Sequence, residues 1–579
     1  MRVAAKPLIL HLPKLRPTAN NIFTFRNFYW LPNKTPTETR TSSIKTLWPP
    51  LATQGISMAA SPPPTVQVRD TIDLTDVEKK IFDRLLGTLR HFGLQNQLRV
   101  AGGWVRDKLL GKDCCDIDIA LDNMLGSEFV DKVTEYLLFV GEEPQGIAVI
   151  PSNPEQSKHL ETARMRICDM WIDFVNLRCE EYCDNSRIPT QQKFGTAEQD
   201  AYRRDLTINS LFYNINTSSV EDYTERGIED LKSGRIVTPS PAKITFMDDP
   251  LRVLRAIRFG ARFEFTLDEE LKKAAAHEDV KAALGAKISR ERIGTEIDLM
   301  ISGNQPVKAM ANICDLTLFW VVFSLPPKFE PSVPEGCDRL CIDYLDATWN
   351  LIQLIGVSTF DEEQRRLCLY AAMFLPLRKT IYKDKKGKEI PVVNYIFRES
   401  LKRKVSDVET VMNVHNSIDK FLSLIPFLAS NENVQLSDIE WGKQYADVPV
   451  TSQLRVLTGF LLREIKVFWR VSLLLSTLLY KIDCTEDLQS NHFDLNKLRD
   501  AFVAVESAMV ELGLEKVWDV KPLVNGKEIM NVLQLKSGGP LVREWQQKLL
   551  AWQLAHPSGT SEEGLEWMKE THSKRVKME

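Results

Sequence analysis

The 579-residue sequence lacks several features that mark simple classes of protein. It has no apolar run of the ~20 residues that a membrane-spanning helix needs, since the most apolar run, residues 471–480, is about half that length. Its ten cysteines are scattered, which argues against a disulfide framework and favours a reducing compartment. A net charge of −4 provides no overall positive field, so nucleic-acid binding would depend on local basic patches. The composition therefore favours a soluble globular protein of roughly three or four domains, without membrane insertion.

Acidic residues are almost absent from residues 1–57, which contain eight lysines and arginines and a single acid, Glu38. This composition is typical of an organelle-targeting peptide, although a disordered tail shares it. Met58 opens Met-Ala-Ala-Ser-Pro-Pro-Pro where the basic segment ends, and this position favours a second start site. We expect a targeting peptide at 1–57 and a disordered linker at 58–74. The full-length form is expected in the mitochondrion or chloroplast, and a form starting at Met58 in the cytoplasm and nucleus.

Hydrophobic periodicity predicts a small sheet followed by many helices. Thr75-Asp-Val-Glu78 is a capping-box pattern at the start of an amphipathic helix. Short strands are expected at residues 98–101, 116–121, 148–150, 167–177, 212–216 and 235–237. Beyond Pro250 the chain is expected to be mostly helical, with an exposed lysine-rich loop at 383–388. The predicted class is α+β, with a small mixed β-sheet head at 75–225, an all-α neck at 226–300, and an all-α body and tail at 301–579.

Asp116 and Asp118 form the most informative pair. Side chains alternate along a strand, so both carboxylates are expected on one face. Neighbouring carboxylates repel each other unless a cation neutralises them, and Mg²⁺ is often held by one or two carboxylates together with substrate phosphates. A solvent-facing polar strand has the same pattern. Asp173, in an otherwise apolar segment, is equally consistent with a third ligand, a general base or a salt-bridged side chain.

Gly102 and Gly103 lie just before this predicted strand, and a short helix carrying Arg106 follows them. Glycines let the backbone approach a bound group closely, and the start of a helix offers free N–H groups. An arginine one turn later adds charge-assisted hydrogen bonds. The combination predicts a site for phosphate oxygens beside the carboxylates, which makes a metal-ligand role for Asp116 and Asp118 much stronger.

Five motifs occur in order between residues 98 and 300. They are Gly102–Gly111 with Asp116-Ile-Asp-Ile-Ala120, Arg203–Leu211, Gly227–Leu231, Asp248–Phe259 and Ser289–Glu296. Together they resemble the class II CCA-adding tRNA nucleotidyltransferases of the polymerase-β-like superfamily. The resemblance implies addition of the 3′-terminal CCA sequence to tRNA from CTP and ATP, without a nucleic-acid template and by two-metal transfer with Mg²⁺. It also implies that Arg204 binds the nucleotide. The helical remainder of the chain resembles the family only in being helical.

Asp249 and Pro250 predict the start of a helix, with Asp249 as the cap and Arg252, Arg255 and Arg258 along one face. Cytosine and adenine each present an amino donor beside a ring-nitrogen acceptor, which a carboxylate beside an arginine complements. Guanine and uracil present the reverse arrangement and are rejected. The resemblance assigns this selection to Asp249 and Arg252, and nucleotide or phosphate contacts to Arg255 and Arg258. A capped helix with an Asp249–Arg252 pair and solvated or tRNA-facing arginines is the alternative.

Two other functions are consistent with the same head: a bacterial-type poly(A) polymerase and a catalytically silent RNA-binding relative. The sequence contains no His-Asp dipeptide, so the phosphohydrolase that some relatives append is not expected. The expected partners are tRNA, CTP and ATP, and the chain is expected to be a monomer.

Overall fold

The computed structural model describes residues 66–150, 162–181, 191–327, 333–429, 439, 441–442, 448–480 and 494–578. The expected targeting peptide and the start of the expected linker lie outside these residues. Residues 66–74, which the sequence assigned to a disordered linker, pack against the core through Val66, Val68, Ile72 and Leu74. The Arg69 N–H also donates to the Leu109 carbonyl oxygen at 2.8 Å. Apolar residues alternate with polar ones on either side of Asp70 and give this segment a packing face. Among the described helices, none is long and apolar enough to cross a membrane.

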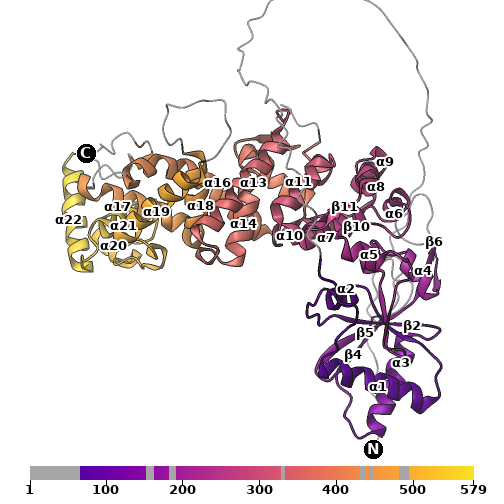
Figure 1. Ribbon diagram of the computed structural model, residues 1–579. Coiled ribbons are helices and arrows are strands. Elements are labelled where there is room, and N and C mark those ends of the chain that lie inside the picture. Colours follow the sequence, from indigo (N-terminus) through magenta and orange to yellow (C-terminus); the bar gives the residue numbers. More distant parts are fainter. Residues whose placement is uncertain are drawn as a thin grey trace, which may run out of the picture. The chain divides into compact units, whose positions relative to one another are not determined.

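A seven-stranded mixed sheet forms the head, with strand order β3-β4-β5-β2-β1-β8-β9 (Figure 1). The strands are β1 (Leu98–Ala101), β2 (Ile117–Leu121), β3 (Ile147–Ile150), β4 (Thr162–Ile167), β5 (Met170–Asn176), β8 (Phe212–Asn214) and β9 (Ser219–Glu221). β2 and β5 run parallel, whereas the other neighbours are antiparallel. Among the described residues three strand pairs lie outside this sheet. The first two are β6 (Arg178–Glu181) with β7 (Gln191–Phe194) and β10 (Arg235–Ile236) with β11 (Thr266–Leu267).

Helices α1 (Asp76–Phe92) and α3 (Gly126–Phe139) pack together on the head. The predicted capping box is confirmed at α1, where the Glu78 N–H donates to Thr75 Oγ1 and the Thr75 N–H donates to Glu78 Oε2. Phe129 of α3 packs against Phe174 of β5, with ring centroids 5.6 Å apart. Because side chains alternate along a strand, Asp173 points to the face that α3 leaves open.

Two of the expected strands differ in the structure. The segment 167–177 is not one strand but the hairpin β4–β5, whose turn has Cys168 at φ +50° and Asp169 at φ +65°. Left-handed residues at both positions are typical of a two-residue hairpin turn, but Asn-Gly or Asp-Gly usually occupies them, so Cys168-Asp169 does not predict a turn. β2 begins at Ile117, so Asp116 lies immediately before the strand rather than within it. The expected loop 383–388 is largely the turn of a further hairpin.

The remainder is mostly helical, as predicted (Figure 1). Its helices are α4 (Ala197–Tyr202), α5 (Gly227–Lys232), α6 (Ala242–Asp248), α7 (Leu251–Phe263), α8 (Glu269–Ala275), α9 (Glu278–Lys287), α10 (Arg290–Ile301), α11 (Pro306–Asp315), α12 (Phe319–Val322), α13 (Cys337–Ile355), α14 (Glu362–Met373), α15 (Val392–Tyr395), α16 (Val405–Ala429), α17 (Val450–Ile465), α18 (Trp469–Leu479), α19 (Leu495–Glu511), α20 (Gly526–Val532), α21 (Pro540–Ala555) and α22 (Ser561–Met578). The hairpin is β12 (Ile381–Lys383) with β13 (Glu389–Pro391). The α+β class is confirmed, but the neck and body are not all-α as expected, since they contain the β10–β11 and β12–β13 pairs.

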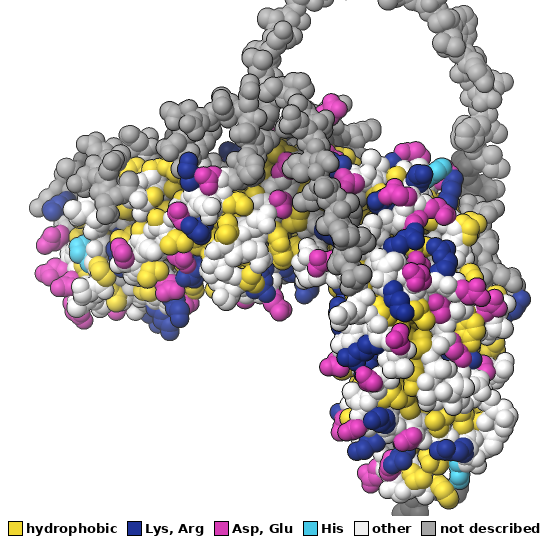
Figure 2. Space-filling model, in the orientation of Figure 1, with side chains coloured by type: hydrophobic (Ala, Val, Ile, Leu, Met, Phe, Trp, Pro, Cys, Tyr) yellow, Lys and Arg dark blue, Asp and Glu magenta, His cyan; other side chains and the backbone are white. Residues whose placement is uncertain are grey.

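Basic and acidic side chains are interspersed on the face that Figure 2 shows, so this face carries no single large positive patch. This distribution agrees with the small net charge of −4. The eight cysteines among the described residues are all free thiols, as expected of a protein without a disulfide framework.

Candidate active site

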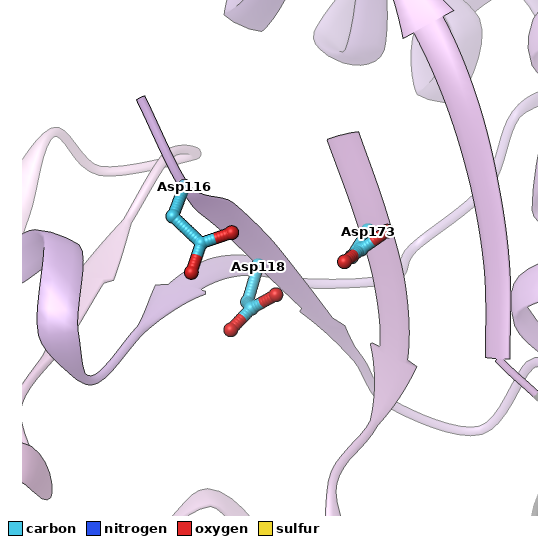
Figure 3. A group of neighbouring side chains, drawn as sticks. All are labelled: Asp116, Asp118 and Asp173. Carbon is cyan, nitrogen blue, oxygen red and sulfur yellow. The ribbon is translucent and has the colours of Figure 1, made fainter. Parts of the chain in front are cut away.

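Three aspartates from two strands come together on the open face of the sheet (Figure 3). Asp116 precedes β2, Asp118 lies in β2 and Asp173 lies in β5, where the parallel register pairs it with Asp118. One carboxylate oxygen from each lies within 4.8 Å of the others. Asp116 is exposed, and the other two are half-buried. A cluster of carboxylate oxygens at this spacing fits a hard divalent cation.

The charge of this cluster is unfavourable without a cation. Burial, together with repulsion from Asp116 and Asp173, raises the pKa of Asp118 to about 6, although Arg204 and Arg164 oppose the rise. A divalent cation among the three carboxylates would remove the repulsion. The donor set and its excess negative charge therefore both fit a metal site.

Asp173 is also half of an ion pair. Arg164 of β4 lies opposite it in the register, and its Nη2 donates to Asp173 Oδ2 at 2.8 Å while its Nε donates to Oδ1. The hydrogen bond and the charge of Asp173 raise the pKa of Arg164. Two of the roles that the sequence left open, metal-site carboxylate and salt-bridged side chain, are therefore geometrically compatible.

Gly102 allows an arginine to lie across the start of α2 (Gly103–Leu109). Gly102 has φ +70°, and a Cβ on it would lie 2.7 Å from Arg204 Nη1. Asp200 holds this arginine, accepting from Arg204 Nε at 3.0 Å and Nη2 at 2.8 Å. Burial alone would raise the pKa of Asp200, but Arg203 and Arg204 lower it to about 2. Gly103 is less constrained, since the nearest atom to an added Cβ would be Arg106 Nη2 at 3.6 Å.

Arg106 lies inside the protein rather than on the open face. Its Nε donates to Asp107 Oδ1 at 2.8 Å, and its Nη1 donates to Asn209 Oδ1. The guanidinium carbon lies 4.7 Å from the centroid of the Phe263 ring on α7. Burial lowers the pKa of Arg106. These contacts tie α2 to α7, so the phosphate contact that the sequence suggested for Arg106 stays a prediction.

Asp249 and Arg252 are anchored separately. Asp249 Oδ2 accepts from Arg292 Nη2 of α10 at 2.8 Å, and Oδ1 accepts from the Leu251 N–H at 3.2 Å. The expected cap is therefore wrong by one residue: Pro250 rather than Asp249 holds the N-cap position and α7 begins at Leu251, although Asp249 still accepts from the first N–H of the helix. Arg252 Nη2 donates to the Arg203 carbonyl oxygen at 2.7 Å. The direct Asp249–Arg252 pair, which the sequence offered as the alternative, is therefore replaced by the Asp249–Arg292 pair.

Arg255 and Arg258 are paired with acids of the same chain. Arg255 Nε donates to Asp205 Oδ2 at 2.7 Å, and Arg258 Nε donates to Glu296 Oε2 at 2.6 Å. Both guanidinium groups also lie near the Phe259 ring. The expected nucleotide or phosphate contacts of both arginines remain predictions, and in this structure the arginines fasten α7 to its neighbours.

Sequence reasoning missed the partners that orient these groups: Asp200, Arg292, Glu296 and Arg164. Arg292 and Glu296 lie in the Ser289–Glu296 motif, so the motif itself was a signal, but nothing in it identifies the residue that each one contacts. Asp200 and Arg164 lie outside every motif, and only the folded chain brings them to the site.

Comparison with known proteins agrees with this geometry. Residues 98–237 match the poly A polymerase head domain family. The mitochondrial CCA tRNA nucleotidyltransferase of Saccharomyces cerevisiae is 33% identical over 82% of this chain and 87% of its own. The tRNA nucleotidyltransferase cca2 of Schizosaccharomyces pombe is 32% identical over 86% of this chain and 98% of its own.

The fold has known counterparts as well. A crystal structure of the Bacillus stearothermophilus CCA-adding enzyme in complex with CTP has a TM-score of 0.56 at 17% identity, covering 87% of this chain and 100% of that chain. This likeness concerns the fold, whereas the sequence relatives match along most of their length. The chain therefore belongs to the family of the CCA tRNA nucleotidyltransferases.

Proposed function

We propose that this protein adds the 3′-terminal CCA sequence to tRNA, using CTP and ATP and no nucleic-acid template. The observation that carries the proposal is the cluster of Asp116, Asp118 and Asp173 on one face of the head, in a chain that belongs to this family. In each cycle the terminal 3′-oxygen forms a bond to the α-phosphorus of the nucleotide, and the bond to the pyrophosphate breaks. The 3′-hydroxyl loses its proton.

We assign the metal to Mg²⁺, because the donors are carboxylate oxygens and the substrate supplies phosphate oxygens. Bound by Asp116 and Asp118, two ions would lower the pKa of the 3′-hydroxyl and stabilise the triphosphate and the departing pyrophosphate. Asp173 adds a third carboxylate to this site. Arg164 engages both of its oxygens, which favours a metal-site role over that of a general base.

Nucleotide binding is assigned to the glycine pair and the arginines near it. Arg204, which Asp200 holds beside Gly102, would contact the triphosphate, with Gly103 and Arg106 at the start of α2. Arg204 lies near enough to Asp118 to oppose the rise of its pKa, so it puts positive charge next to the carboxylates, as an electrostatic clamp on phosphates requires.

Base selection is assigned to Asp249 and Arg252. The carboxylate would accept from the amino group of cytosine or adenine, and the guanidinium would donate to the ring nitrogen. Arg255 and Arg258, which hold α7 through Asp205 and Glu296, would support this position, and nucleotide or phosphate contacts are assigned to them as well.

The cellular location is part of the same proposal. The relatives from Saccharomyces cerevisiae and Candida glabrata are named as mitochondrial, which supports mitochondrial targeting by residues 1–57. Delivery to the chloroplast and a cytoplasmic or nuclear form from Met58 follow from the composition of the same segment. Fluorescent fusions of the full-length chain and of a chain starting at Met58 would separate these locations.

Incorporation of labelled nucleotides into tRNA that lacks its CCA end tests the function. We expect two cytidines from CTP alone, one further adenosine when ATP is added, and no addition without a divalent cation. Long adenosine tails from ATP alone would instead support a poly(A) polymerase, and no incorporation would support a silent RNA-binding relative. Asp116→Asn or Asp118→Asn should abolish incorporation. Activity retained by either variant would contradict the metal assignment.

A further inference from the structure

Trp171 is an exposed tryptophan next to the three carboxylates. It is 44% exposed, whereas Trp104, Trp469 and Trp545 are buried. Trp171 lies two residues before Asp173 on β5, so both side chains project to the same face of the sheet. The β2–β5 register pairs Ile117 with Ile172, and one further step places Trp171 level with Asp116. An exposed indole beside a charged site offers a flat apolar face on which a ligand can pack.

Two arginines of β4 lie on the same face. The register places Arg164 opposite Asp173 and Arg166 opposite Trp171. The guanidinium carbon of Arg164 lies 5.7 Å from the centroid of the Trp171 ring. Arg164 and Arg166 are both partly exposed, with side chains 42% and 45% accessible. An aromatic face with cations around it suits the base and the phosphates of a single-stranded nucleic acid.

The position of the ring is fixed from one side. A Cβ on Gly146 would lie 3.1 Å from the Trp171 ring, so the ring lies closely against the backbone at the start of β3. Arg164 in turn is held by its two hydrogen bonds to Asp173. Trp171 and Arg164, which we call the platform, are therefore attached to the same carboxylate cluster that the reaction uses.

The order of the strands indicates which substrate meets this surface. β2, which carries Asp118, lies between β1 and β5. On the β1 side are Gly102 and Arg204, which we assigned to the triphosphate. On the β5 side are Asp173, Arg164 and Trp171. The nucleotide and the acceptor have to reach the carboxylates from different sides, so the β5 side remains for the acceptor strand.

We propose that Trp171, with Arg164 beside it, stacks against the base of the 3′-terminal nucleotide of the tRNA and holds its 3′-hydroxyl at the carboxylates. This inference rests on the proposed CCA addition. The terminal base changes after the first addition, so the acceptor site has to accept more than one base. Stacking on an aromatic face meets this requirement, because every base has a π-face, whereas hydrogen bonds to base edges would not.

The test compares two acceptors, a CCA-less tRNA and the same tRNA with an abasic 3′-terminal nucleotide. We measure the Kd of each by fluorescence anisotropy without nucleotide, and the KM for tRNA and for CTP on the acceptor with the base. Trp171→Ala should raise Kd and KM for the normal acceptor roughly tenfold, as the loss of one stacked base predicts. The KM for CTP should change less than about twofold, and Trp171→Phe should restore most of the affinity.

The abasic acceptor separates stacking from a structural effect. Wild type should bind it roughly tenfold more weakly, and Trp171→Ala should bind it as wild type does, because the interacting base is already missing. Phe139→Ala is the matched control, since Phe139 is 71% exposed on α3 and its loss should leave both Kd values unchanged. Equal losses on both acceptors, or normal binding by Trp171→Ala, would overturn the platform.

Failure of this inference is distinguishable from failure of the proposed function. If wild type adds no nucleotide to CCA-less tRNA, CCA addition is wrong, and the two Kd values of wild type still report whether the terminal base is stacked. If Trp171→Ala does not fold, the comparison of normal with abasic acceptor on wild type and Trp171→Phe carries the test. Equal affinity of wild type for both acceptors contradicts the platform in every case.

Discussion

The repulsion among the three carboxylates should make Asp118 costly for the stability of the metal-free protein. Burial and the neighbouring charges raise its pKa from an ordinary 3.8 to about 6. A displacement of this size corresponds to about 3 kcal/mol of unfavourable free energy in the ionised folded state. Asn resembles the protonated carboxyl in size and carries no charge. We therefore expect Asp118→Asn to raise the free energy of unfolding by about 3 kcal/mol at neutral pH without metal.

The pH dependence follows from the same two values. Below about pH 4 the carboxyl is protonated in both the folded and the unfolded state, so it imposes no penalty. Between about pH 4 and 6 it is ionised in the unfolded chain but still largely protonated in the folded one, and the wild type loses stability relative to the variant. Above about pH 6 the difference is complete and constant. The variant should thus gain nothing at pH 4 and its full advantage at pH 7.

Urea unfolding in EDTA at both pH values measures this difference. Asp131→Asn, the same change at an exposed position on α3, is the control and should shift stability by less than about 0.5 kcal/mol. Mg²⁺ should stabilise wild type but not Asp118→Asn, because a ligand that binds only the folded state stabilises it. A variant less stable than wild type at pH 7 without metal, or an advantage that is the same at both pH values, would refute the electrostatic argument.

Three further predictions concern the groups around the carboxylates. Gly102→Ala should lower kcat/KM about 100-fold, because the added Cβ would displace Arg204, whereas Gly103→Ala should lower kcat/KM far less. Equal losses of kcat/KM in incorporation assays would contradict this steric account. Arg292→Gln should lower kcat/KM for CTP and ATP roughly tenfold, since it removes the partner that orients Asp249. Competition assays should also show weaker discrimination against GTP and UTP, and unchanged selectivity would exclude a role of Arg292 in orienting Asp249. Arg106→Ala should lower the free energy of unfolding by about 3 kcal/mol in urea titrations, with little rescue by Lys, because a buried pair loses one partner. Full stability with lost activity would contradict this structural role and leave Arg106 a role at the triphosphate alone.

The sequence predicted elements well where the signal is local. The capping box of α1, the bounds of β1 and the left-handed Gly111 that follows α2 are all properties of a few adjacent residues. The β4–β5 hairpin was not recognised because Cys168 and Asp169 are an unusual turn pair. With the hairpin missing, Arg164 could not be placed opposite Asp173.

The arginines show why the site was only partly predictable. Their positions near the site were apparent from the motifs, but apart from the local pairs of Arg106 with Asp107 and of Arg204 with Asp200, their partners come from distant parts of the chain. Arg106 pairs with Asn209, 103 residues away, and Arg258 with Glu296, 38 residues away. Which acid an arginine meets depends on how helices pack, and no periodicity within a helix contains that information. Sequence reasoning therefore identified the groups but not which of them are already engaged.

Asp249 and Arg252 show what this distinction means for function. A direct pair between them, the alternative that the sequence left open, would use N–H donors of Arg252 on the carboxylate oxygens of Asp249. Fewer donors and acceptors would then remain for a base. In the structure Arg292 and the Leu251 N–H bind Asp249, and backbone carbonyls bind Arg252. A carboxylate has about four lone-pair sites and a guanidinium has five N–H donors, so each side chain is fixed in place with capacity remaining. If Asp249 and Arg252 read one base together, as we propose, they have to be held apart by other partners, and Arg292 is the residue that holds Asp249.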